Sequence, residues 1–182
     1  VKDNDGDENF NVFMVNPAAP PAAGSNVPAP LNLTNAKGVR VIIYNVPDAD
    51  PNHIYIGINE RDKAWHDLYK VQISTGTKTL VRENKDRVTG WYFDNANNLR
   101  LATRSTQAGD TELLSVNPDG FKTIYTCDAF ETCGPSGFDI GRFVVVRSAH
   151  SRVERCDCTA GGVGGGVGWQ RDLDPSQDQA VI

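Results

Sequence analysis

The sequence has no long apolar run and no excess of positive charge, and these two absences exclude two classes of function. No stretch of the 182 residues approaches the ~18 consecutive apolar residues of a membrane-spanning helix. We therefore expect no membrane partner. The formal net charge is −5, with 18 basic and 23 acidic residues. Because nucleic-acid binding needs a basic face to neutralise phosphates, we expect no nucleic-acid partner.

The chain also lacks the apolar periodicity of helices. No segment carries a sustained apolar stripe with a spacing of about 3.6 residues. Alternating apolar and polar positions instead predict short strands, separated by turn residues such as Pro-Asp-Gly at 118–120. The expected strands are Val39–Tyr44, His53–Asn59, Asp67–Ser74, Lys78–Glu83, Thr89–Asp94, Leu99–Ser105, Thr111–Asn117, Phe121–Cys127, Phe138–Ile140 and Phe143–Arg147.

Composition divides the chain into zones. The first ten residues, VKDNDGDENF, hold neither an initiator methionine nor an apolar leader, so we expect the chain to begin inside a longer natural protein. Residues 17–36 are rich in Pro, Ala and Asn and predict a loop. Residues 148–182 are rich in glycine and poor in large apolar side chains. We expect this tail to be poorly ordered, and to be a truncated or frame-shifted end without an evolved function.

An internal repeat gives the fold prediction. Segments recur at an offset of 44 or 45 residues: Phe93-Asp94 with Phe138-Asp139, Leu68 and Val71 with Leu113 and Val116, and Leu80-Val81 with Ile124-Tyr125. A period of about 40–50 residues with four strands per unit is typical of β-propeller blades. The sequence therefore predicts an all-β fold over residues 1–147, a partial propeller of about three four-stranded antiparallel blades.

The small number of blades has a consequence for partners. A propeller usually needs at least about four blades to close. An unclosed stack leaves open blade edges, which pair readily with another chain. We therefore expect either a homo-oligomer formed through these edges or a further domain that covers them.

Three segments resemble a known family. Residues 2–16 (KDNDGDENFNVFMVN), 58–81 (INERDKAWHDLYKVQISTGTKTLV) and 90–104 (GWYFDNANNLRLATR) are similar to the N-terminal propeller of prolyl oligopeptidase-family serine peptidases, of the dipeptidyl-aminopeptidase and acylaminoacyl-peptidase type. The resemblance covers about residues 2–140. It implies a propeller that filters substrates and docks an α/β-hydrolase domain. Together with the cysteines, it favours a periplasmic or secreted location.

The nucleophile of that family has no counterpart here. A nucleophile elbow needs Gly-x-Ser-x-Gly at a strand-to-helix turn, and Gly134-Pro135-Ser136-Gly137 fails the spacing. We therefore assign no catalytic residue and predict a non-catalytic propeller fragment. Two alternatives stay open. One is a self-associating module that binds peptides or glycans, and the other is a hydrolase with an unrecognised site.

The charged run at 60–67 supplies the candidate site residues. Glu60, His66 and Asp67 are the candidate catalytic groups, because a carboxylate can orient an imidazole for proton transfer. The competing interpretation is structural, since successive strand residues point to opposite faces. Arg61 and Asp62 are candidate ligand-binding residues, and the arginine fork would pair a carboxylate.

Aromatic residues give a further candidate. Trp65 lies in a polar loop, so we expect it to be exposed and to contact a ligand. The others default to core packing between blades, although they would also suit a sugar-binding face: Trp91, Tyr92, Phe93, Phe121, Tyr125 and Phe138.

Metal and cofactor sites are weakly indicated. Asp3, Asp5 and Asp7 alternate as in a calcium loop, but the glycine comes early and no glutamate closes the loop, so an acidic turn is the alternative. Cys127 and Cys133 flank a short loop and predict a disulfide; free thiols or a zinc site with the remaining cysteines are the alternatives. The glycine run at 161–168 lacks the Lys-Ser/Thr of a phosphate loop. We expect no cofactor.

Overall fold

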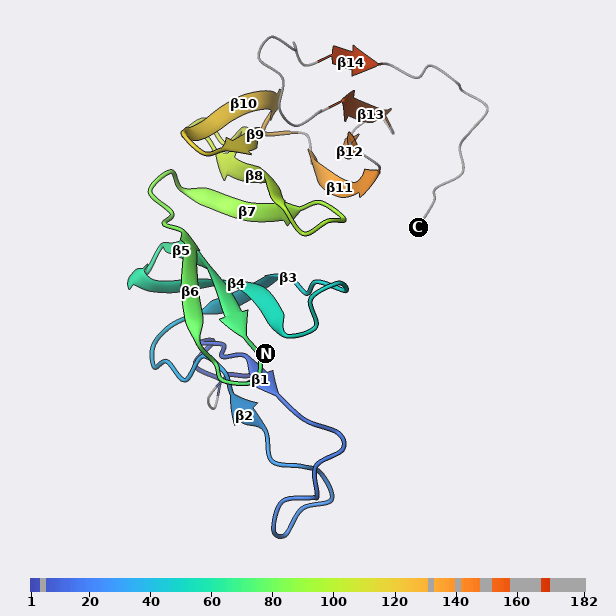
Figure 1. The fold of residues 1–182 in the computed structure, drawn as a ribbon. Coiled ribbons are helices and arrows are strands. Elements are labelled where there is room, and N and C mark those ends of the chain that lie inside the picture. The colour runs from blue at the N-terminus through green and yellow to red at the C-terminus, as the bar shows by residue number, and fades with distance from the viewer. Residues whose placement is uncertain (4–5, 131–132, 140–141, 148–151, 158–167, 171–182) are drawn as a thin grey trace. The chain divides into compact units, whose positions relative to one another are not determined.

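The computed structural model describes all 182 residues except 4–5, 131–132, 140–141, 148–151, 158–167 and 171–182 (Figure 1). The described part is built from β-strands and turns, without a helix. Within it, no helix is available that could cross a membrane. The chain divides into two compact units, Val1–Trp91 and Tyr92–Ile182, and each is described by itself.

The first unit contains a four-stranded antiparallel sheet with the order β3-β4-β5-β6 and a small sheet of β1 and β2 (Figure 1). The strands are β1 Phe13–Met14, β2 Leu31–Asn32, β3 Val41–Asn45, β4 His53–Asp62, β5 Trp65–Gln72 and β6 Lys78–Arg82. Alternation along β4 places Ile54, Ile56 and Ile58 on one face, where they are buried. Val12 and Leu33 pack into the same core. The opening segment therefore covers one face of this sheet.

The connection between β1 and β2 is a Pro/Ala-rich loop that is largely exposed. Its described hydrogen bonds are local: the Ala22 N–H donates to the Val27 carbonyl over 2.9 Å, and the Ser25 N–H donates to the Ala22 carbonyl over 2.9 Å. The loop predicted over 17–36 is shorter in the structure, because Leu33 is buried and β2 lies within that range.

The second unit contains two further four-stranded antiparallel sheets, with the orders β10-β9-β8-β7 and β11-β12-β13-β14. The strands are β7 Val88–Phe93, which begins in the first unit, β8 Leu99–Ser105, β9 Thr111–Asn117, β10 Gly120–Cys127, β11 Cys133–Asp139, β12 Arg142–Arg147, β13 Arg152–Asp157 and β14 Gly168–Gln170. Phe138 of β11 packs against buried Leu101 and Leu113 of the preceding sheet. Apolar side chains thus link the two sheets of this unit.

The predicted all-β architecture is confirmed. Each of the ten expected strands overlaps a strand of the structure, and consecutive four-stranded antiparallel sheets form a partial, propeller-like fold. Two strands, β13 and β14, lie in the 148–182 tail, where the sequence predicts none. β13 forms because it pairs with the whole length of β12, from Arg142 to Arg147. The rest of the tail lies outside the described residues.

Candidate functional site

The charged run at 60–67 forms the tip of the β4–β5 hairpin. Asp62 lies opposite Trp65, and Lys63 and Ala64 make the turn. The strand register shifts between Ile58 and Asp62, so extra residues on β4 form a bulge. A bulge bends the strand and re-aims its side chains.

Asn59 fixes this bulge in place. It is 9% exposed, its Oδ1 accepts a hydrogen bond from the Arg40 N–H over 2.6 Å, and its Nδ2 donates to the Lys63 carbonyl over 3.0 Å. At the tip, the Asp62 carboxylate accepts from the Ala64 N–H over 2.9 Å. Asp62, a predicted ligand-binding residue, therefore caps a turn in the way that aspartate commonly does.

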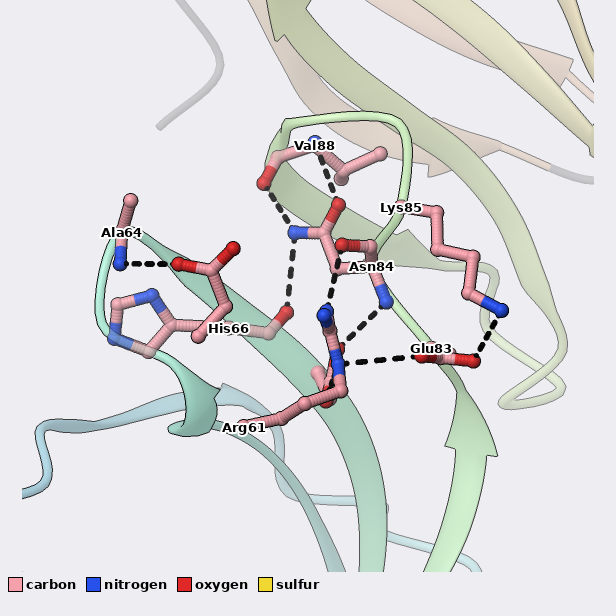
Figure 2. Close-up of polar contacts among 9 residues, drawn as sticks. Arg61, Ala64, His66, Glu83, Asn84, Lys85 and Val88 are labelled. Atoms are coloured by element: carbon pink, nitrogen blue, oxygen red, sulfur yellow. Dashed lines mark hydrogen bonds and ion pairs between the residues drawn. The ribbon is translucent and has the colours of Figure 1, made fainter.

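Hydrogen bonds join Arg61, Asp67 and Asn84 in a group that is called here the Arg61–Asp67–Asn84 network. Figure 2 shows Arg61 beside Asn84. Arg61 Nε and Nη2 donate to the two oxygens of Asp67, each over 2.8 Å. Asp67 Oδ1 also accepts from the Asn84 backbone N–H over 2.7 Å, and Arg61 Nη2 donates to the Asn84 carbonyl over 2.9 Å. The planar arginine fork is thus occupied by an internal carboxylate.

The Asn84 side chain extends this network to the connection between β6 and β7. Its Nδ2 donates to the His66 carbonyl over 3.2 Å and to the Val88 carbonyl over 2.8 Å, while its Oδ1 accepts from the Val88 N–H over 2.9 Å. Asn84 and Asp67 are each 2% exposed. Because buried polar groups need hydrogen-bond partners, this arrangement fixes the hairpin to the β6–β7 connection.

The electrostatics of the network favour its ionised form. Burial alone would raise the pKa of Asp67, but the hydrogen bonds from Arg61 and the Asn84 N–H, with the arginine charge, lower that pKa below its usual value. The same hydrogen bond raises the pKa of Arg61. At the exposed rim, Glu83 lies 3.4 Å from Arg61 Nε and 2.8 Å from Lys85 Nζ. The pair is therefore charged across the neutral range.

His66 does not form an acid–base pair with Asp67. The Asp67 carboxylate accepts from Arg61 and Asn84, whereas His66 Nε2 is buried and has no hydrogen-bond partner among the described residues. Burial lowers the pKa of His66, and the nearby Arg40 charge lowers it further, although Asp67 opposes this. His66 and Asp67 are therefore adjacent in the sequence, but their side chains lie in separate environments in the structure.

The remaining site predictions are placed as follows. Glu60 lies at the exposed rim, where its carboxylate is 3.2 Å from Lys78 Nζ. Trp65 is half-buried rather than exposed. The Gly134–Gly137 segment lies within β11, away from any strand-to-helix turn. The arrangement supplies a polar surface and an ion pair between exposed Arg61 and buried Asp67, without an exposed nucleophile or acid–base couple among these residues.

Metal and disulfide predictions are only partly covered by the described residues. The Asp7 carboxylate accepts from the Asn9 backbone N–H over 3.0 Å and so closes a turn, whereas Asp5 lies outside the described residues. Across the part of the chain that is described, no group of His, Cys, Asp and Glu could hold a metal ion. Cys127 is buried and disulfide-bonded. The side chain of Cys133 lies outside the described part, so that pairing stays a prediction.

A second cross-strand ion pair repeats the first. Arg104 on β8 donates through Nε to Glu112 on β9 over 2.7 Å, and Nη2 lies 2.7 Å from the same carboxylate oxygen. Glu112 follows Asp67 by 45 residues, which is the offset that relates Leu68 to Leu113. The repeat predicted from the sequence used that offset for apolar positions and for Asp94 with Asp139, but not for Asp67. The same offset applied to Arg61 gives Thr106, so it identifies the acidic member of this pair but not Arg104, which follows Arg61 by 43 residues.

A surface cluster on the β3–β4 connection was also missed. Asp50 accepts from His53 Nδ1 over 2.8 Å and from Lys70 Nζ over 3.0 Å. These hydrogen bonds, that of His53 first, lower the pKa of Asp50 to about 2. Lys70 comes 20 residues after Asp50, and only the antiparallel pairing of β4 with β5 brings them together.

The comparisons with known proteins agree with the sequence motifs. The chain is 29% identical over 143 residues to dipeptidyl aminopeptidase BIII of Pseudoxanthomonas mexicana, which is 77% of this chain and 20% of that protein. It is 28% identical over 118 residues to dipeptidyl peptidase family member 6 of Caenorhabditis elegans, 65% of this chain and 15% of that protein. No family model and no solved structure matches it. The chain thus spans a fifth or less of these curated relatives. By this similarity it is related to peptidases of the prolyl oligopeptidase type, as its sequence motifs predict.

Proposed function

We propose that this chain is a non-catalytic propeller module of a dipeptidyl-peptidase-like serine peptidase, in which it controls substrate access and docks an α/β-hydrolase domain. The observation that supports this proposal is the succession of four-stranded antiparallel sheets in a chain similar to two dipeptidyl peptidases. The charged residues at 60–67 support a structural role, since Arg61 and Asp67 are bonded to each other and to Asn84.

Two assays test this proposal. The purified chain is expected to release no product from dipeptidyl p-nitroanilides and to take no label from a fluorophosphonate probe, because the sequence holds no nucleophile elbow. Hydrolysis that disappears on a single substitution would contradict the non-catalytic role.

The second assay uses a chimera, in which this chain replaces the matching segment of dipeptidyl aminopeptidase BIII. The chimera is expected to fold and to cleave dipeptidyl substrates, with an altered ratio of rates for short and long peptides. A chimera that folds but keeps the parent's ratio would argue against control of substrate access. Failure of the hydrolase domain to remain associated after proteolysis of the junction would argue against docking.

A second candidate function, self-association, is favoured by one strand edge. β6 is an edge strand of its sheet, and its Leu80 and Val81 are 52% and 41% exposed. An unpaired edge with apolar side chains is a template for another chain. Light scattering is expected to show a molar mass that rises with concentration, and Leu80→Lys is expected to abolish the rise. Val27→Lys, at a loop position that is 62% exposed, should leave the rise unchanged. A strict monomer at high concentration contradicts self-association.

A further inference from the structure

We propose that His66 makes the β4–β5 hairpin acid-responsive: protonation of its half-buried imidazole opens the hairpin tip and breaks one of its hydrogen bonds to the β6–β7 connection. This inference is independent of the proposed function, because it concerns the first unit alone. Its starting point is the buried Nε2 atom, which has no hydrogen-bond partner among the described residues. A protonated imidazole carries N–H donors on both nitrogens, so at this position a charged donor would be left without an acceptor.

The packing around His66 leaves little room for adjustment. A Cβ added to Gly57 would lie 2.9 Å from His66 Cβ and 2.5 Å from Cε2 of Tyr44. The side chains of β3 and β5 therefore approach each other over a glycine of β4. The Cβ of His66 is therefore held close to the β4 backbone, at a position where the neighbouring strand has no room for a side chain.

The charged groups around His66 would not neutralise the positive charge that its imidazole gains on protonation. Arg40, which comes just before β3, disfavours protonation of His66 because both groups would be positively charged. Asp67 of β5 favours it, but its carboxylate already accepts hydrogen bonds from Arg61 of β4 and from Asn84. The other carboxylates of the hairpin and of the β6–β7 connection have partners of their own: Glu60 pairs with Lys78, Asp62 accepts from the Ala64 N–H, and Glu83 pairs with Lys85 and Arg61.

The sign of the pH effect follows from the lowered pKa of His66. Above a pH of about 6.5 the imidazole is neutral in both the closed and the open hairpin, so the pH has no effect on opening. Below that value the open hairpin takes up a proton first, and opening becomes easier as the pH falls towards the lower pKa of the closed form. Opening breaks the hydrogen bond from Asn84 Nδ2 to the His66 carbonyl, and with it one tie to the β6–β7 connection.

Amide hydrogen exchange, measured by mass spectrometry on the whole chain and corrected for intrinsic rates, tests this inference. Between pH 7.5 and 5.5, protection of peptides covering residues 59–68 is expected to fall, by up to about tenfold for one pH unit below 6.5. The β8–β9 hairpin is an internal control, since it keeps the Arg104–Glu112 pair and carries Thr111 at the position 45 residues after His66. Its protection is expected to stay constant.

Three variants test whether His66 is the cause of the pH-dependent loss of protection. His66→Gln is expected to remove the pH dependence, while His53→Gln, which removes the surface histidine bonded to Asp50, should retain it. Arg40→Gln, at an exposed position, is expected to reduce the fall, because the closed hairpin then accepts a proton more readily. An equal loss of protection in both hairpins, or a fall that persists in His66→Gln, overturns the proposal. If His66→Gln does not fold, an unchanged fall in Arg40→Gln overturns it.

Discussion

Replacement of Asp67 by alanine is expected to lower the free energy of unfolding of the first unit by about 3 kcal/mol. The Asp67 side chain is 3% exposed and accepts two hydrogen bonds from Arg61 and one from the Asn84 N–H. Its removal leaves the buried Asn84 N–H without its hydrogen-bond acceptor and leaves Arg61 with only the partly exposed Glu83 as a counter-charge. Removing one partner of such a contact costs more than the contact itself contributes, because the other partner remains desolvated.

Urea unfolding, followed by tryptophan fluorescence, measures this effect. Glu60→Gln is the matched control. Glu60 lies on the same hairpin as Asp67, and it forms an exposed ion pair with Lys78 of β6. Exposed pairs contribute about 0–1 kcal/mol, so the control is expected to unfold close to the parent chain. If the Asp67 and Glu60 variants lose equal stability, the Arg61–Asp67–Asn84 network does not stabilise the attachment of the β4–β5 hairpin to the β6–β7 connection.

Gly57→Ala is expected to destabilise the same sheet by about 1–3 kcal/mol, through overpacking. The added methyl group would meet Tyr44 at 2.5 Å and His66 at 2.9 Å, both closer than van der Waals contact. The His66 atom is a Cβ, which cannot move without its strand. On conformational grounds alone, alanine in a strand would stabilise the chain relative to glycine.

The control for that substitution is Gly137→Ala. Gly137 also lies in a strand, β11, and a Cβ there would meet no heavy atom within 4 Å. We expect it to be neutral or slightly stabilising in the same thermal or urea measurement. Equal losses at Gly57 and Gly137 would show that the effect comes from the strand backbone, whereas a loss confined to Gly57 confirms the close approach of β3 and β5 side chains.

The strands could be predicted because their information is local. Alternation at Leu99–Ser105 and Thr111–Asn117 gives the bounds of β8 and β9 as the structure has them. β13 has little apolar alternation of its own, and it forms a strand because β12 offers a pairing edge. A pairing of that kind depends on a neighbouring segment, so the pattern within Arg152–Asp157 does not reveal it.

The candidate site shows the same division between local and distant information. The charged run singled out Arg61 as a ligand-binding candidate and Asp67 as a catalytic candidate, but it predicted neither their mutual ion pair nor the part of Asn84, which comes 17 residues after Asp67. Trp65 was expected to be exposed from its polar neighbours, and the hairpin half-buries it. Pairing and burial are set by the register of β4 with β5, and the bulge in that register has no evident sequence signature.

The Pro/Ala-rich loop between β1 and β2 has a practical consequence. Its described hydrogen bonds, such as those between Ala22 and Val27 and between Ser25 and Ala22, run within the loop itself. Gly24 has a φ of 74° at its tip, and no heavy atom lies within 4 Å of where a Cβ would be. A fluorophore, an affinity handle or a tether to a sensor chip could therefore be attached beside Gly24, leaving the charged hairpin unmodified for measurement.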